Sequence, residues 1–214
     1  MKMNKGLFVI TMLATLFFTS CSEFNNIIKS GDYLYRYEAA KQYYADGKYT
    51  RAVVLLQDVI SVLKGTDKGE ESLYLLGISA YKARDYEAAA NFLKKYYETY
   101  TNGLYTQDAR FYNAMALYKN TPEPKLDQTE TYEAVTAFQN LLEIFPQSIY
   151  AKESQDMIFK LQDKLVEKEY LSAKTYFDLG SYFGNCNFGG NNYQACIITA
   201  ENAMRDYPYS KRRE

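Results

Sequence analysis

The sequence has 214 residues, with 25 Lys and Arg against 26 Asp and Glu, and it contains 23 Tyr, no Trp and no His. Because His is the commonest general base and metal ligand, its absence excludes Ser-His-Asp catalysis, Cys-His catalysis and every His-containing metal site. The net charge of −1, with both signs scattered along the chain, argues against a nucleic-acid partner.

The start of the chain predicts a secretory signal over residues 1–20. Lys2 and Lys5 precede an uncharged apolar run, and small residues follow before Cys21. A membrane-spanning helix needs about 20 apolar residues, which is more than this run offers. The alternative, a buried N-terminal helix, would need a polar face that the run lacks. We therefore expect cleavage before Cys21, which leaves residues 21–31 as the modified cysteine and a linker.

The end of this signal, Phe18-Thr19-Ser20-Cys21, resembles the lipobox of bacterial lipoproteins, although Leu is usual in its first position. The resemblance implies a diacylglycerol on the Cys21 thiol and an acyl chain on its amine, and two or three chains anchor a protein stably. Ser22, where Asp would favour the inner membrane, favours the outer membrane. We expect a lipid anchor at Cys21 on the periplasmic side of the outer membrane, and no other cofactor.

The rest of the chain predicts helices in a 37-residue repeat. Residues 40–52 align with residues 77–89, where a small residue is followed by an aromatic residue, a turn, a Tyr and an Ala. This is the tetratricopeptide pattern, in which small residues lie where two antiparallel helices approach most closely. The pattern predicts an all-α tetratricopeptide-repeat superhelix of antiparallel helix pairs over residues 32–214.

Two further units follow with insertions. The third carries Ala114 in its first helix, and its second helix, with Ala134, starts late after a polar stretch over residues 120–130. The fourth carries Ala173 and contains a Gly/Asn-rich loop over residues 184–192, which no helix would tolerate. Both units end in the sequence aromatic-Pro-x-Ser. We therefore expect about four repeats.

Two columns of aromatic side chains follow from this register, three residues before and four residues after each small position. In such repeats these positions face the concave groove, where a Tyr buries a large area at low entropy cost and suits a peptide partner. Alternatively, the rings pack helices against one another, and aromatic grooves also bind sugars. The residues predicted to bind substrate are Tyr37, Tyr44, Tyr74, Tyr81, Phe111 and Tyr118, and the fourth repeat has Tyr170 and Phe177 in the same positions.

Other polar side chains give weak signals for chemistry. Cys186 and Cys196 can form a disulfide in an oxidising compartment, or Cys196 can remain a free thiol in a packing position. Two cysteines without His make a poor metal site, so we expect none. Carboxylates such as Glu167 and Glu169 are typical of a solvated helix face rather than of an acid–base pair. The sequence therefore predicts a protein that is not an enzyme.

The lipobox, the four repeats and their helix ends together resemble the BamD family over the whole chain from Cys21. The resemblance implies a scaffold of the β-barrel assembly machinery. Its N-terminal repeats would engage unfolded outer-membrane proteins, and its C-terminal repeats would bind the periplasmic domains of the barrel-forming subunit BamA, beside other subunits. The loop over residues 184–192 departs from proteobacterial members and looks like a Bacteroidetes-type variant. The most specific matches are Glu169, Ala173, Tyr176, residues 191–195 and residues 207–210.

Two expectations remain open. A repeat array needs a polar capping helix, and the BamD family has a fifth unit where this sequence stops, four residues after Ser210. We therefore expect part of the region that contacts BamA to lie outside this sequence. The alternative function is that of another tetratricopeptide lipoprotein adaptor, for cell-wall synthesis, a pilus or secretion machinery.

Overall fold

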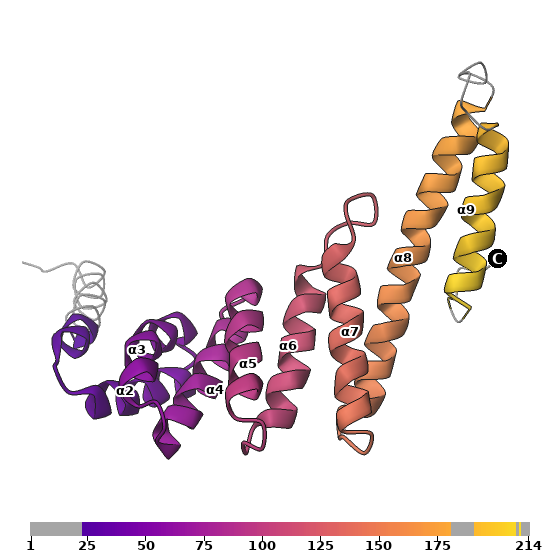
Figure 1. Cartoon of the computed structure of the whole chain (residues 1–214). Coiled ribbons are helices and arrows are strands. Elements are labelled where there is room, and N and C mark those ends of the chain that lie inside the picture. Colours follow the sequence, from indigo (N-terminus) through magenta and orange to yellow (C-terminus); the bar gives the residue numbers. More distant parts are fainter. Residues whose placement is uncertain (1–22, 181–190, 209, 211–214) are drawn as a thin grey trace, which may run out of the picture. The chain divides into compact units, whose positions relative to one another are not determined.

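The computed structural model describes residues 23–180, 191–208 and 210. Within these residues the chain is helical and contains no β-strand, which confirms the all-α fold of helix pairs (Figure 1). The chain divides into two compact units, Met1–Asp85 and Tyr86–Glu214. The helices are α2 (Tyr33–Ala45), α3 (Tyr49–Val62), α4 (Asp67–Lys82), α5 (Tyr86–Thr99), α6 (Thr106–Asn120), α7 (Thr129–Ile144), α8 (Ala151–Leu179) and α9 (Asn192–Asp206).

The first unit is built around α3, which packs against both α2 and α4. Ala40 of α2 and Ala52 of α3 are completely buried, together with Leu56 of α3 and Leu76 of α4. Side chains as small as Ala let two helix backbones come close, and the larger aliphatic residues fill the remaining space. Residues 23–29, which we expected to be part of a linker, instead form a further helix. Its Ile27 is buried in the core of the unit.

Local signals set the ends of these helices. The Asp32 carboxylate accepts hydrogen bonds from the backbone N–H groups of Leu34 and Tyr35 at 2.9 and 3.0 Å, and so caps the start of α2. Gly47 ends the turn after α2 with φ +75°, a left-handed conformation that favours glycine. Thirty-seven residues later, Arg84 adopts the same conformation with φ 66°. The repeat therefore extends to the backbone of its turns.

The predicted register holds at the small positions. Ala40, Gly77 and Ala114 begin the aligned segments of the first three repeats, and all three are buried. Ala52 and Ala89, in the second helices of the first two repeats, are completely buried as well. These residues have no polar group to satisfy and almost no side chain to order, so their burial is what a close helix–helix contact requires.

In the second unit, consecutive helices from α5 to α9 pack side by side. The core between α6, α7 and the first half of α8 contains aromatic and aliphatic side chains. The aromatic ring of Phe138 is completely buried, and the ring of Phe111 stacks on that of Tyr150 with centroids 4.1 Å apart. The full set of buried core residues is Phe111, Ala114, Ala134, Phe138, Leu141, Met157, Ile158 and Leu161.

The polar stretch between α6 and α7 is held by two long side chains. The Gln128 amide is buried, and its Nε2 donates to the carbonyl oxygens of Glu123 and Leu126 at 2.8 and 3.0 Å. From α8, the Lys164 ammonium donates to Thr121 Oγ1 at 2.6 Å and to the Pro122 carbonyl at 3.1 Å. Burial lowers the pKa of Lys164, because it disfavours the charged form. The polar stretch is therefore held in place within the second unit.

Helix α8 has 29 residues, nearly twice the length of its neighbours α7 and α9. Its first half packs against α7 and its second half runs antiparallel to α9 (Figure 1). Gly180 ends α8 with φ +46°, and a Cβ there would lie 2.6 Å from the Tyr193 hydroxyl, so only glycine fits without a shift. Within the described ranges, no helix combines the length and apolar character that a membrane crossing requires.

Candidate functional site

Two of the six aromatic residues predicted to line a groove lie in the protein core. Tyr37 is 2% exposed and Phe111 is 4% exposed. Their rings pack helices against one another, which was the alternative interpretation, so neither ring offers a binding surface. Neighbouring side chains cover both rings.

The other four predicted residues, Tyr44, Tyr74, Tyr81 and Tyr118, are half-buried on α2, α4 and α6. The ring of Tyr44 contacts the ring of Tyr49 edge-on, with centroids 5.6 Å apart. Each of the four tyrosines keeps part of its ring at the surface of its own unit. Their role in substrate binding stays a prediction.

Tyr37 instead belongs to a polar cluster that joins α2 to α4 in the first unit. Its hydroxyl donates a hydrogen bond to the Glu71 carboxylate, and the Lys41 ammonium lies 2.8 Å from the same carboxylate. Burial, and then the bond to Glu71, raise the pKa of Tyr37 to about 12. Burial alone would raise the pKa of Glu71, but the bonds from Lys41 and Tyr37 lower it. The three groups therefore favour a charged pair with a neutral phenol.

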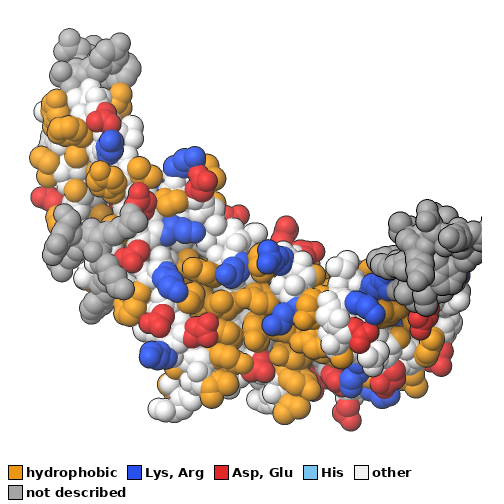
Figure 2. Space-filling view, turned by 180° about the vertical axis from the view of Figure 1, so that it is seen from behind, with side chains coloured by type: hydrophobic (Ala, Val, Ile, Leu, Met, Phe, Trp, Pro, Cys, Tyr) orange, Lys and Arg blue, Asp and Glu red, His pale blue; other side chains and the backbone are white. Residues whose placement is uncertain are grey.

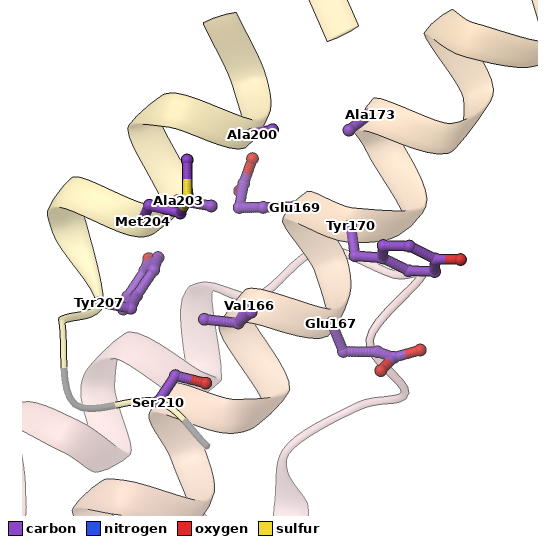
Figure 3. Close-up of a pocket in the computed structure, with 10 residues that line it drawn as sticks. All are labelled: Val166, Glu167, Glu169, Tyr170, Ala173, Ala200, Ala203, Met204, Tyr207 and Ser210. Atoms are coloured by element: carbon purple, nitrogen blue, oxygen red, sulfur yellow. The ribbon is translucent and has the colours of Figure 1, made fainter. Parts of the chain in front are cut away.

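A second feature is an open hollow of about 560 Å³ between α8 and α9, which we call the α8–α9 hollow (Figure 3). Ala200, Ala203 and Met204 face it from α9, and the Glu169 carboxylate points between the two helices, whereas the Tyr170 ring points away from α9. The full lining is Val166, Glu167, Glu169, Tyr170, Ala173, Ala200, Ala203, Met204, Tyr207 and Ser210.

The lower end of this hollow is fixed to the rest of the second unit by two side-chain hydrogen bonds. The Tyr207 hydroxyl lies 3.0 Å from the Tyr132 hydroxyl of α7, and burial, followed by this bond, raises the pKa of Tyr207. The Ser210 hydroxyl donates to Asp163 Oδ1 of α8 at 2.7 Å. These two bonds therefore anchor the base of the hollow.

The exposure of α9 distinguishes it from the other helices. None of its side chains is buried, and several apolar ones are largely exposed. Figure 2 shows hydrophobic side chains gathered over the arm that α8 and α9 form. On the neighbouring helix α8, Tyr170 and Phe177 are each 60% exposed. The large exposed hydrophobic residues of α9 are Tyr193, Ile197, Ile198 and Met204.

Sequence reasoning named the ends of the fourth repeat but missed the hollow itself. Ala200 was named as part of the repeat pattern, but Val166 on α8 and the residues Ala203 and Met204 on α9 were not singled out. The signal was present in the spacing of three and four residues between Ala200, Ala203 and Tyr207, which places them on one face of a helix. That spacing predicts a contact face, and it cannot tell whether a neighbour covers the face.

The remaining predicted sites lie partly outside the described residues. Cys21 and Cys186 fall outside them, so the lipid anchor and the disulfide stay predictions. Cys196 lies half-buried on α9. Among the described residues, no three Cys, Asp or Glu side chains gather closely enough to hold a metal ion.

The fold and its repeat register define a helical-repeat protein of the tetratricopeptide type. The chain belongs to the YfiO family of outer membrane lipoproteins, whose family model matches residues 32–214. It is also similar to a protein of Aquifex aeolicus (strain VF5) named putative outer membrane protein assembly factor BamD. The two are 26% identical over 171 residues, which cover 79% of this chain and 56% of that relative. The chain thus spans about half the length of the curated relative it matches.

Proposed function

We propose that this protein is a lipid-anchored periplasmic scaffold of the machinery that inserts β-barrel proteins into the outer membrane. It would bind unfolded barrel precursors and the periplasmic domains of the BamA-type barrel subunit, beside other subunits of the machinery. Membership of an outer membrane lipoprotein family and the similarity to a protein named as an assembly factor support this proposal. A lipid on Cys21 would keep the scaffold at the membrane where barrels are inserted.

The observation that carries the proposal is the apolar surface of α8 and α9. A soluble helix normally buries one face, because burying apolar area contributes about 25 cal/mol per Å². Helix α9 buries none of its side chains completely, and the α8–α9 hollow beside it is lined mainly by apolar residues. An exposed apolar patch with a polar rim is typical of a surface that binds another protein. We assign the periplasmic domains of the barrel subunit to this surface.

The experiment is affinity purification of the full chain in mild detergent. We expect a barrel subunit with periplasmic repeat domains to co-purify. Met204→Lys places a charge inside the α8–α9 hollow and should abolish the co-purification. The matched control is Ile149→Lys, which places the same charge on a side chain of the second unit that is 83% exposed and outside the hollow. This variant should retain the barrel subunit.

Two results would contradict the proposal. The wild-type protein could capture no barrel subunit but retain components of cell-wall synthesis, a pilus or a secretion apparatus, which would favour the alternative adaptor function. The barrel subunit could also co-purify equally with both lysine variants, and the binding surface would then lie elsewhere. Mass spectrometry of the mature N-terminus tests the anchor independently, because an acylated Cys21 should be the first residue.

A further inference from the structure

The second unit contains another groove, lined by side chains of α5, α6 and α7, with a volume of about 670 Å³. We call it the Arg110 groove. It differs from the α8–α9 hollow because polar groups form a larger share of its lining. Amide side chains enter it from α5 at Asn91 and from α7 at Asn140, and four charged residues contribute to its walls: Lys94, Glu98, Arg110 and Glu133.

Arg110 is held in one orientation. Its guanidinium lies over the ring of Tyr97, with 4.2 Å between the guanidinium carbon and the ring centroid. The Tyr97 hydroxyl in turn reaches Asn113 Oδ1 at 3.4 Å, and Asn113 Nδ2 donates to the Ala90 carbonyl at 2.8 Å. This chain of contacts joins α5 to α6. The guanidinium is therefore pre-organised before any ligand arrives.

The donors of this guanidinium lack an acceptor within the part of the chain that the structure describes. Arg110 Nε is buried and has no hydrogen-bond partner, and the side chain forms no ion pair there. A buried donor without an acceptor is unfavourable, and an arginine presents its donors as a planar fork that fits a carboxylate. Burial closes Nε to an outside ligand, so an acceptor from outside the described chain would bind the terminal amino groups of the guanidinium, on the side that lines the groove.

The charges around Arg110 limit what this acceptor can be. Lys94 and Glu98 approach each other to 4.0 Å, which leaves Arg110 and Glu133 as the lining charges without an ion pair among the described residues. Two cations and two anions give the groove no net charge, so it does not attract a polyanion. A single carboxylate suits Arg110, and the amides of Asn91 and Asn140 suit the backbone of an extended peptide.

We propose that the Arg110 groove binds a carboxylate carried by an extended peptide segment of another protein, with Arg110 as the anchor. The carboxylate belongs either to an Asp or Glu side chain or to a chain terminus. It accepts two parallel hydrogen bonds from the two terminal nitrogens, in the plane of the guanidinium, whose face stays on the ring of Tyr97. This site is separate from the surface assigned to the barrel subunit, and it stands whether or not that assignment holds.

The test is a nuclear magnetic resonance titration of the full chain in mild detergent, at constant ionic strength. The first probe is acetyl-Ala-Asn-Glu-Asn-Ala-amide, the second has Gln in place of Glu, and the third is the Gln peptide with a free terminal carboxylate. The resonance of the Arg110 Nε–H group reports on changes at the guanidinium to which it belongs. We expect a saturable shift with at least one carboxylate peptide, at an affinity at least tenfold higher than that of the neutral peptide.

The first and third probes identify the source of the carboxylate. If neither moves the Arg110 resonance more than the neutral peptide does, the proposal is wrong, and this comparison needs no variant. Backbone resonances of α6 then follow binding in the variants. Arg110→Lys keeps the charge but loses the fork, and should weaken binding at least fivefold. Lys95→Gln, the matched control on the exposed surface of α5 and outside the lining of the groove, should change it less than twofold. Equal losses in the two variants would overturn the role of Arg110.

Discussion

The third helix pair, α6 and α7, and the fourth, α8 and α9, carry the same repeat pattern but differ in burial. In the third pair, Phe111 precedes the small residue Ala114 and is 4% exposed, stacked on Tyr150. In the fourth, Tyr170 precedes Ala173 and is 60% exposed. The repeat register therefore fixes the face of a helix that a residue occupies, whereas the neighbouring element decides whether that face becomes core or surface.

The largest effect on the free energy of unfolding is expected at the buried residue, Phe111. Phe111→Ala removes a ring from the core of the second unit and should lower the free energy of unfolding by about 3–5 kcal/mol, because transfer and cavity terms add. Urea denaturation followed by far-UV circular dichroism measures the change. Phe111→Leu, which keeps most of the volume, should cost less than about 1.5 kcal/mol. An alanine variant as stable as the leucine variant would show that the Phe111 ring does not stabilise the core as its burial indicates.

A smaller effect on stability is expected in the first repeat, where Tyr37 occupies the register position of Phe111. Burial and the bond to Glu71 raise the pKa of Tyr37 to about 12, above its ordinary value of about 10. The folded state then holds this proton more tightly than the unfolded state does. The resulting stabilisation is fully present below about pH 10 and is lost as the pH rises towards about 12, on the order of 2 kcal/mol in all.

The measurement is the free energy of unfolding of wild type and Tyr37→Phe across this alkaline range. The wild type should lose stability more steeply than the variant, because the phenylalanine has no proton to lose. Tyr170→Phe, at the exposed equivalent position, is the matched control and should follow the wild type. Parallel curves for the wild type and Tyr37→Phe would show that the phenol of Tyr37 is not held in the folded state as its contacts indicate.

Much of the fold was predictable from local spacing. The repeat of 37 residues located Ala40, Gly77 and Ala114, and each is buried as a close helix contact requires. The start of α2 at Asp32 was predictable for the same reason, because a cap acts on residues two and three positions away. Such features depend on residues that are close together in the sequence, so their spacing is enough to predict them.

Contacts between residues that are far apart in the sequence were not predictable in this way. Lys164 bonds to Thr121 across 43 residues, and the Tyr132 and Tyr207 hydroxyls meet across 75 residues. The predicted groove residues Tyr37 and Phe111 became core because side chains from other helices cover them. A periodic pattern contains no information on such distant neighbours, so the α8–α9 hollow appears only once the helices are packed.

The smallest effect on the free energy of unfolding is expected at the exposed residue, Tyr170. Tyr170→Ala removes a ring of the same size class as Phe111 from the equivalent register position. Because that ring is 60% exposed, the free energy of unfolding should change by no more than about 0.5 kcal/mol in urea denaturation. A loss near that of Phe111→Ala would mean that the ring is packed in solution and that the register alone decides burial. If stability is unchanged but co-purification of the barrel subunit falls, the ring serves a partner rather than the fold. The same aromatic position would then build the core in one repeat and the binding surface in the next.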